Sequence, residues 1–162
     1  MKLHELATQR FLIVPIGPSG AGKSTLFKKL KEENPDLVPF SFDALRHEWY
    51  DPNDYQKAWQ ASTEDKTFFN RAQQNFMDLI KQGKSIYVDN TNLSPKSRRF
   101  FVEAAKKVGY RTVAYVFNVD VDTLLQRQST RPDKSVPEHA VRQHVAAMKA
   151  PQAGEFDEVH NV

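Results

Sequence analysis

The sequence contains no cysteine, which excludes disulfide bonds, thiolate metal sites and thiol nucleophiles and fits a reducing compartment. Long hydrophobic runs are missing too: the longest apolar segment is far below the roughly 18 residues that a membrane span needs. The N-terminal segment Met1 to Glu5 also lacks the apolar core of a signal peptide. We therefore expect a soluble, cytoplasmic protein without a membrane partner.

Length and composition fit one compact domain. The chain has 162 residues, of which 40% are hydrophobic, enough to fill one core but not to build a second. We therefore expect a single domain over residues 1–162. The formal net charge of +3 and the isoelectric point of about 9.1 mildly favour an anionic partner, although a solvated basic surface has the same composition.

The most informative segment is GPSGAGKS, residues 17–24, which precedes a helix-like stretch. Its spacing, G-x-x-x-x-G-K-S, is that of a phosphate-binding loop, in which glycines let the backbone amides converge on phosphate oxygens at a helix N-terminus. In such a loop Lys23 reaches the β- and γ-phosphates of ATP, and Ser24 ligates Mg²⁺. An ordinary glycine turn is the alternative. The residues expected to contact the nucleotide are Gly20, Ala21, Gly22, Lys23, Ser24 and Thr25.

Short apolar runs alternate with helical patterns along the chain. This β-α-β-α order predicts an α/β fold with a central, mainly parallel sheet and helices on both faces. In such sheets ligands bind beyond the carboxyl ends of the strands, so residues that follow a strand are candidates for the site. The expected strands are Phe11 to Ile16, Leu37 to Phe40, Ser85 to Val88 and Thr112 to Phe117.

Three helices are expected between these strands, over residues 24–33, over residues 64–82 and from Ser94-Pro95 to the residue before Gly109. Pro15 conflicts with its place in a central strand, where we expect a missing ladder bond. In the second helix the residues that should share the buried face are Phe69, Ala72, Phe76 and Ile80.

The end of the second strand is followed by Asp43 and Arg46, which share a face of a turn or a new helix. Phosphoryl transfer to a hydroxyl needs a carboxylate that orients the hydroxyl and takes its proton, and an arginine can hold an acceptor phosphate through two hydrogen bonds. From the spacing alone, a helix cap with a local ion pair is an equal alternative.

The third strand is followed directly by Asp89, in the place of a Walker-B-like aspartate that holds the Mg²⁺ shell. Asn90, Thr91 and Asn92 come next, and their side chains are candidates to hydrogen-bond the substrate or to fix the loop. For the two asparagines, an Asx turn that leads into the next helix is a strong alternative.

A basic segment at about residues 127–137 lies between two helical patterns and contains Arg127 and Arg131. Such a segment can close over ATP as a lid, where arginines neutralise charge on the transferred phosphoryl group and water is excluded. A solvated connector is the alternative on composition. Ser135 and Glu138 have the spacing of a capping box for the last helix, with Pro137 in its first turn.

Together these segments resemble the P-loop kinase domain of phage-type polynucleotide 5′-hydroxyl kinases, over roughly residues 11–150. The loop motif is generic to its superfamily, whereas the combination is more specific. The resemblance implies a P-loop kinase fold with a helical lid, the use of ATP and Mg²⁺, and the 5′-hydroxyl end of single-stranded DNA or RNA as substrate, in nucleic-acid repair or modification. The matching segments are the phosphate loop, the D-x-x-R of Asp43 and Arg46, the T-N-L-x-P of residues 91–95 and the R-x-x-x-R of Arg127 and Arg131 ahead of K-x-V-P.

Carried over residue by residue, the resemblance implies that Asp43 is the general base on the 5′-hydroxyl and that Arg46 grips the 3′-phosphate of the acceptor nucleotide. Arg131 would stabilise the transition state from the lid, and Arg127 would support nucleotide binding. One departure concerns Asp89, which lies two positions before the threonine of the T-N-L motif, whereas the phage enzyme has its acidic residue directly before it.

Two other functions use the same motifs. The first is a kinase of a small-molecule hydroxyl on a nucleoside, sugar or antibiotic, because the scaffold serves all of these acceptors. Arg46 distinguishes this function from a polynucleotide kinase, because an acceptor without a phosphate would not need an arginine to bind it. The second is an ATP-binding switch that hydrolyses nucleotide slowly and is insensitive to the loss of Asp43.

Two surface features carry weaker signals. An aromatic group, Trp49, Tyr50, Tyr55 and Trp59, is able to stack bases of a single strand, but packing in a helical flap is at least as good an interpretation. A basic group is a candidate for contact with a nucleic-acid backbone, although most such helices are simply solvated. Its members are Lys96, Arg98, Arg99, Lys106, Lys107 and Arg111.

Overall fold

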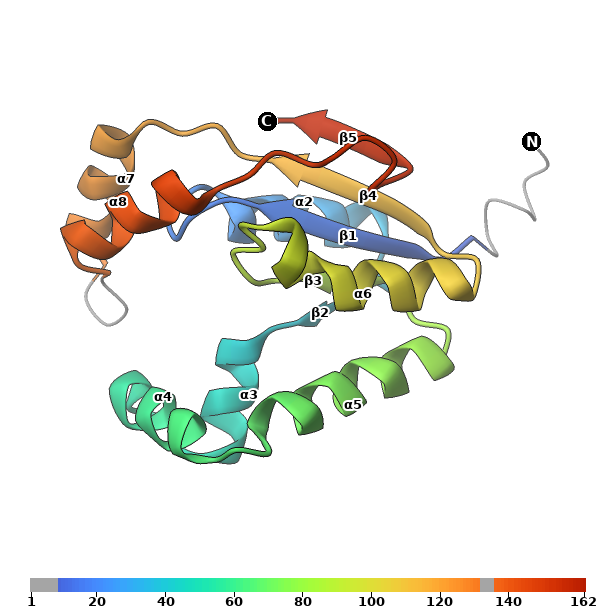
Figure 1. Cartoon of the computed structure of the whole chain (residues 1–162), viewed down its shortest axis with the longest axis horizontal. Coiled ribbons are helices and arrows are strands. Elements are labelled where there is room, and N and C mark those ends of the chain that lie inside the picture. The colour runs from blue at the N-terminus through green and yellow to red at the C-terminus, as the bar shows by residue number, and fades with distance from the viewer. Residues whose placement is uncertain (1–8, 132–135) are drawn as a thin grey trace.

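The centre of the computed structural model, which describes residues 9–131 and 136–162, is a sheet of five strands in the order β2-β3-β1-β4-β5 (Figure 1). Every neighbouring pair is parallel, so the predicted mainly parallel sheet is confirmed. All carboxyl ends therefore lie along one edge. The strands are β1 (Phe11–Ile16), β2 (Val38–Phe40), β3 (Ile86–Val88), β4 (Arg111–Val116) and β5 (Glu158–Asn161).

Helices cover both faces of the sheet, as predicted. Alternate side chains of β1 enter different cores: Leu12 and Val14 pack with helices α5 and α6, whereas Ile13 packs with Leu30 of α2. No helix within the described ranges is both long and apolar enough to cross a membrane. The helices are α2 (Lys23–Glu33), α3 (Phe42–Trp49), α4 (Tyr55–Glu64), α5 (Phe68–Lys81), α6 (Pro95–Lys107), α7 (Val121–Ser129) and α8 (Glu138–Ala147).

The predicted helix over residues 64–82 is wrong at its start. Helix α4 ends at Glu64, and the side chain of Asp65 accepts hydrogen bonds from the amide and the hydroxyl of Thr67, at 2.9 and 2.7 Å. Because α5 then begins at Phe68, the buried face runs through residues 68, 72, 76 and 80. Phe69, which was expected on that face, is 54% exposed.

At Pro15, the absent N–H removes no backbone hydrogen bond between β1 and β3. The pairing of β1 with β3 ends at Ile13, and beyond it the carbonyl of Pro15 accepts a hydrogen bond of 2.8 Å from the side chain of Asn92. A proline is tolerated in this central strand because the pairing with β3 has already ended there, while the pairing with β4 continues.

Candidate functional site

The predicted segments meet at the carboxyl edge of the sheet. Residues 17–22 follow β1, Asp43 lies at the start of α3 after β2, and Asp89 follows β3. Helices α7 and α8 lie beyond the same edge, at the left of Figure 1. The amide of Gly17 donates to the carbonyl of Thr91 over 3.1 Å, which joins the loop after β1 to the loop after β3.

The phosphate-binding sequence forms a tight loop that ends in a helix. The backbone is left-handed at Gly20 and Gly22, with φ of 86° and 113°, conformations that glycine adopts without steric cost. Lys23 folds back, and its Nζ donates to the carbonyls of the first two loop residues. Ser24 and Thr25 are exposed in the first turn of α2. The result is a helix N-terminus flanked by a cation and hydroxyl groups, an arrangement that suits phosphate.

Helix α3 contains the predicted pair. The Nη1 atom of Arg46 lies 2.8 Å from Oδ1 of Asp43, so the local ion pair is present. The helix cap is a different residue, because the side chain of Ser41 accepts the amide hydrogen of Ala44. Asp43 is therefore not used as a cap, and its side chain is 30% exposed.

The guanidinium of Arg46 is held by several side chains. It lies over the ring of Trp59 at 4.3 Å and over that of Phe68 at 5.0 Å, and its Nε donates to the hydroxyl of Ser62 over 3.0 Å. Arg46 is only 6% exposed. The side chain is thus fixed by the helices of the flap, α3 to α5, and it fixes Asp43 in turn.

Tyr55, at the start of α4, is a second partner of the same carboxylate. Its hydroxyl donates to Oδ1 of Asp43 over 3.2 Å. Burial, together with the negative charge of Asp43, raises the pKa of Tyr55 to about 12. The tyrosine therefore remains a proton donor at neutral pH, and both contacts with Oδ1 help to set the orientation of the carboxylate.

The polar residues after β3 divide into two kinds. Asp89 and Thr91 remain partly exposed. Asn92 is 3% exposed, and its Nδ2 donates to the backbone carbonyls of Pro15, Val88 and Asn90 at 2.8 to 3.0 Å. This geometry favours the loop-fixing alternative for Asn92. The Oδ1 of Asn90 accepts the amide hydrogen of a residue in α3, whereas its Nδ2 is buried with no partner among the described residues.

Asn92 also has a positive φ of 52°, which gives a prediction. Asn92→Ala should lower the free energy of unfolding by about 2–3 kcal/mol, because it removes three contacts to buried carbonyls and places alanine in a left-handed conformation. Asn92→Gly removes only the contacts and should cost less. Urea unfolding measures both; a glycine variant as stable as wild type would show that the side chain contributes nothing.

The two predicted lid arginines lie against the loop itself. Arg127 donates from Nη1 to the carbonyl of Gly20 over 2.8 Å, and Arg131 donates from Nη1 to the hydroxyl of Ser19 over 2.7 Å. Residues 132–135 of the proposed lid, including Ser135 of the predicted capping box, lie outside the described residues. Helix α8 begins after Pro137, which makes no side-chain cap bond.

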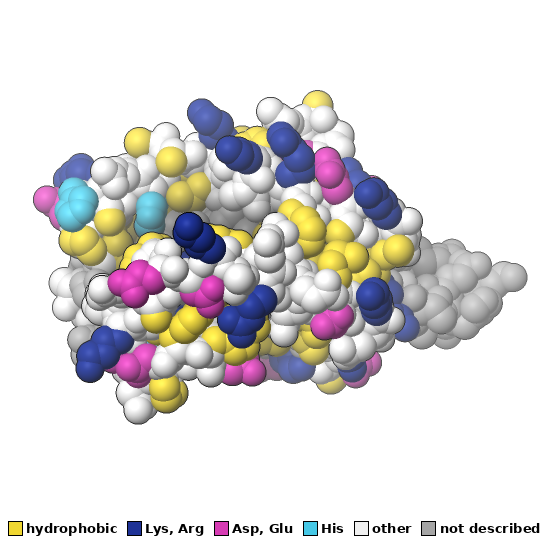
Figure 2. Space-filling model, turned by 60° about the horizontal axis from the view of Figure 1, so that its bottom comes forward, with side chains coloured by type: hydrophobic (Ala, Val, Ile, Leu, Met, Phe, Trp, Pro, Cys, Tyr) yellow, Lys and Arg dark blue, Asp and Glu magenta, His cyan; other side chains and the backbone are white. Residues whose placement is uncertain are grey.

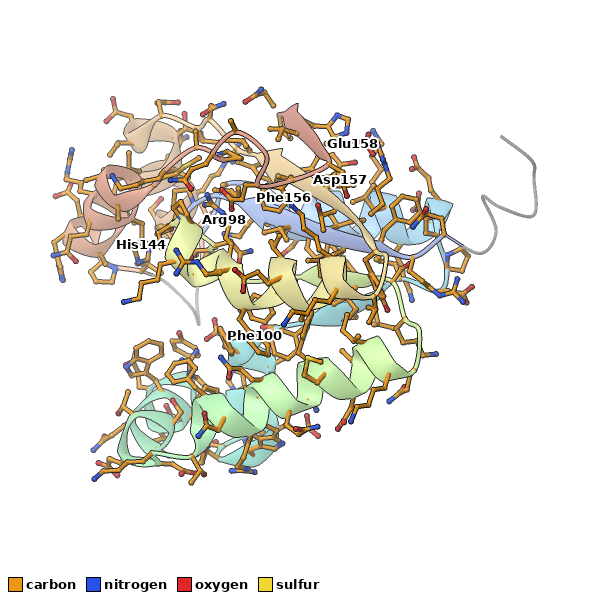
Figure 3. The ribbon with its side chains drawn as sticks, turned by 45° about the vertical axis from the view of Figure 1, so that its right-hand side comes forward. Arg98, Phe100, His144, Phe156, Asp157 and Glu158 are labelled. Carbon is orange, nitrogen blue, oxygen red and sulfur yellow. The ribbon has the colours of Figure 1, made fainter. Side chains whose placement is uncertain are left out.

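Sequence reasoning missed Gln128, which also contacts the loop. Its Nε2 donates to the carbonyl of Ser19 over 3.0 Å, and the residue is 3% exposed. The one available signal was its spacing from Leu124, which is fully buried, since residues four apart share a helix face. A second residue near the loop is His144 of α8 (Figure 3), whose pKa is lowered by burial and by the charge of Lys23.

The basic group of residues 96–111 is not a continuous patch. Arg98 is fully buried and paired with Glu155 at 2.6 Å, and Arg111 is paired with Glu158 at 2.6 Å. Figure 3 shows Arg98 beside the C-terminal segment. On the face shown in Figure 2, basic side chains are dispersed and acidic ones lie among them. The inclusion of Arg98 in a nucleic-acid-binding surface was therefore wrong.

Among the residues that the structure describes, the site offers oxygen ligands suited to Mg²⁺ but no closed cage of protein ligands. The described residues contain no cluster of three or more His, Cys, Asp or Glu residues that could hold a metal. Ser24 is exposed and Asp89 is partly exposed. Mg²⁺ is usually held by one or two protein oxygens together with water and substrate phosphates, so these residues fit the cation when a nucleotide is present.

The sequence profile of a family described as an AAA domain matches residues 12–153. A protein named as a bifunctional polynucleotide kinase/RNA ligase, from Autographa californica nuclear polyhedrosis virus, is 28% identical over 138 residues, which cover 80% of this chain. They cover only 19% of the viral protein, so the chain spans about a fifth of this relative. The resemblance to polynucleotide kinases is thereby confirmed.

Solved structures share the fold. A chain in a structure titled as the Pnkp1/Rnl/Hen1 RNA repair complex superposes with a TM-score of 0.67 at 20% identity, over 86% of this chain and 44% of that one. A gluconokinase from Sinorhizobium meliloti 1021 superposes with a TM-score of 0.63 at 18% identity, over 95% of this chain and 83% of its own. The expected P-loop kinase fold is confirmed.

Proposed function

The chain belongs to the AAA domain family whose profile it matches, and from this premise we propose that it is an ATP-dependent polynucleotide 5′-hydroxyl kinase. It would transfer the γ-phosphate of ATP to the 5′-hydroxyl end of DNA or RNA, in nucleic-acid repair or modification. The observation that carries the proposal is the Asp43 carboxylate, which Arg46 and Tyr55 hold at the same sheet edge as the phosphate-binding loop.

The nucleotide would bind with its phosphates at the loop, which supplies amides from residues 20–25. Lys23 would exchange its present contacts with the loop carbonyls for the β- and γ-phosphates. Arg127 would contact the bound nucleotide from α7. When bound, Mg²⁺ would be held by Ser24 and Asp89 and would neutralise charge on the β- and γ-phosphate oxygens.

The transfer step follows from the place of the carboxylate. The 5′-hydroxyl oxygen bonds to the γ-phosphorus, the bond from that phosphorus to the β–γ bridging oxygen breaks, and ADP leaves. The hydroxyl proton passes to the Asp43 carboxylate. Arg131 would face the charge on the transferred group. Such a reaction depends mainly on positioning and electrostatic stabilisation, which a carboxylate fixed by two partners supports.

The acceptor would lie between the flap and the loop after β3. Arg46 would take the acceptor's 3′-phosphate, and Thr91 would hydrogen-bond the acceptor. Asn90, a candidate for the same contact, has its Oδ1 bonded to α3 and its Nδ2 buried, which favours a loop-fixing role for it. Because Arg46 is buried and packed against two rings, it would present only one edge of its guanidinium to the phosphate. Its contact with Asp43 supports one task, orientation of the carboxylate; contact with the acceptor's phosphate would be a second.

The test is transfer of label from γ-labelled ATP, with Mg²⁺, to a single-stranded oligonucleotide with a 5′-hydroxyl. We expect labelling by the wild type and a loss of about 10- to 100-fold in Arg46→Lys, since lysine keeps the charge but not the planar, two-point geometry. The matched control is Arg99→Lys, on the exposed side of α6, which should label normally.

The competing function is phosphorylation of a small-molecule hydroxyl. The observation that favours it is the fold shared with a gluconokinase. At 18% identity that likeness concerns the fold alone. A protein that binds ATP, leaves the oligonucleotide unlabelled and phosphorylates a compound from a sugar and nucleoside panel would overturn the nucleic-acid proposal in favour of this one.

A further inference from the structure

Gln128 is a buried polar residue whose amide group is used at both ends. Its Nε2 donates to the carbonyl of Ser19 over 3.0 Å, and its Oε1 accepts the amide hydrogen of Val136 over 3.0 Å. The side chain is 3% exposed. A neutral side chain of helix α7 thus connects the phosphate-binding loop to Val136, two residues before the start of α8.

The bond to Ser19 has a directional consequence for the loop. The C=O of Ser19 and the N–H of Gly20 belong to one trans peptide plane, in which the two groups point in opposite directions. Because Gln128 holds this carbonyl toward α7, the N–H of Gly20 points away from α7. Gly20 is among the residues whose amides are expected to meet phosphate, so Gln128 sets the direction of one phosphate donor.

The neighbouring arginines contact the same part of the loop in a different way. Arg127 is exposed and donates to the carbonyl of Gly20, while Arg131 is partly exposed and donates to the Ser19 hydroxyl. A bound triphosphate would compete for both cations, because charge-assisted bonds to phosphate are stronger than bonds to neutral oxygens. Gln128 carries no charge and has no such competitor, so we expect its contact to persist in the nucleotide complex.

The packing around Gly20 supports the same role. A Cβ atom on Gly20 would lie 3.1 Å from Nε2 of Gln128 and 3.7 Å from Cβ of Arg127. The loop backbone is therefore in close contact with the glutamine amide. A shift of this amide would be transmitted to the peptide between Ser19 and Gly20.

We infer that Gln128 is a positioning residue that sets the affinity of the loop for nucleotide phosphates by orienting the Ser19–Gly20 peptide. The inference rests on the proposed function only in that a nucleotide binds at this loop; it does not depend on the acceptor. Gln128 touches no reacting atom and acts through the backbone.

The experiment compares Gln128→Met, Gln128→Glu and a matched control, Gln126→Met, two residues earlier on the exposed side of α7. Calorimetry measures the Kd for ADP with Mg²⁺, and steady-state labelling measures kcat and the KM of ATP and of the oligonucleotide. Gln128→Met loses both hydrogen bonds. Gln128→Glu keeps an acceptor for Val136 but replaces the donor to Ser19 with a carboxylate oxygen.

Both Gln128 variants should bind ADP about tenfold more weakly and raise the KM of ATP by a similar factor, because both lose the hydrogen bond to Ser19 that orients the loop peptide. The oligonucleotide KM should change less than about twofold, and Gln126→Met should match wild type. A merely structural role would instead lower Tm and apparent kcat with both KM values unchanged, and this result would overturn the inference. If no oligonucleotide is labelled, the ADP measurement still decides the inference, while the acceptor proposal fails separately.

Discussion

Replacement of Asp43 by asparagine is expected to lower kcat for transfer to a 5′-hydroxyl about 10²- to 10⁴-fold, the usual contribution of a positioned general base. Asparagine has nearly the same shape and can still accept hydrogen bonds from Arg46 and Tyr55, which both meet Oδ1 of Asp43. The flap should therefore stay folded. What is lost is the basic oxygen that takes the proton of the attacking hydroxyl.

The measurement is a single-turnover labelling assay, together with calorimetry for ADP binding. ADP affinity should stay within about twofold of wild type, since Asp43 makes no contact with the nucleotide in the proposed complex. Asp36→Asn, at an exposed position just before β2, is the control for a change of charge. A slow ATPase rate that Asp43→Asn leaves unchanged, with no labelling of any acceptor by wild type, would favour the ATP-binding switch instead.

The parts of the fold that the sequence predicted are those that local pattern determines. Apolar runs predicted four strands, β1 to β4, to within one residue. For the three inner strands β1, β3 and β4 the runs are nearly continuous, because parallel strands buried on both faces leave no polar alternation. Strand β5, with the sequence EVHN, was missed: it is an edge strand, mostly exposed, and it pairs only with β4. The start of α5 was misplaced because Asp65 forms a turn with Thr67 that helical periodicity does not reveal.

The same division holds for the candidate site. Residues fixed by a motif or by a strand end, such as Lys23, Asp43 and Asp89, could be predicted, because topology brings strand ends together. Tyr55 and Gln128 could not, since each reaches its partner only after α4 and α7 pack against other segments. Arg98 was misjudged for the same reason. The sequence of a basic helix gives no sign that Glu155, far along the chain, covers one of its arginines.

Arg98→Met is expected to give the largest loss of stability, about 3–5 kcal/mol, because it leaves a largely buried carboxylate without its partner. Arg98 is 0% exposed and donates from Nε and Nη2 to the two carboxylate oxygens of Glu155, at 2.6 and 2.9 Å. Its Nη1 also donates to the carbonyls of Asn92 and Lys149, at 2.8 and 3.2 Å. One side chain thus connects α6, the loop after β3 and the segment before β5.

Urea unfolding separates the contribution of the ion pair to stability from that of side-chain packing. The variants compared are Arg98→Met, the exposed control Arg99→Met, and the double variant Arg98→Met with Glu155→Leu. The double variant should recover part of the loss, since two apolar residues leave no unpaired charge.

Burial raises the pKa of Glu155, but hydrogen bonds and charge from Arg98 outweigh burial and hold that pKa below its usual value. A lowered pKa in the folded state stabilises the protein above the unfolded pKa and ceases to do so as the pH falls through the folded one. Wild type should therefore lose this advantage over Arg98→Met in acid; an advantage that stays constant down to pH values below the folded pKa would show that the ion pair is not its source.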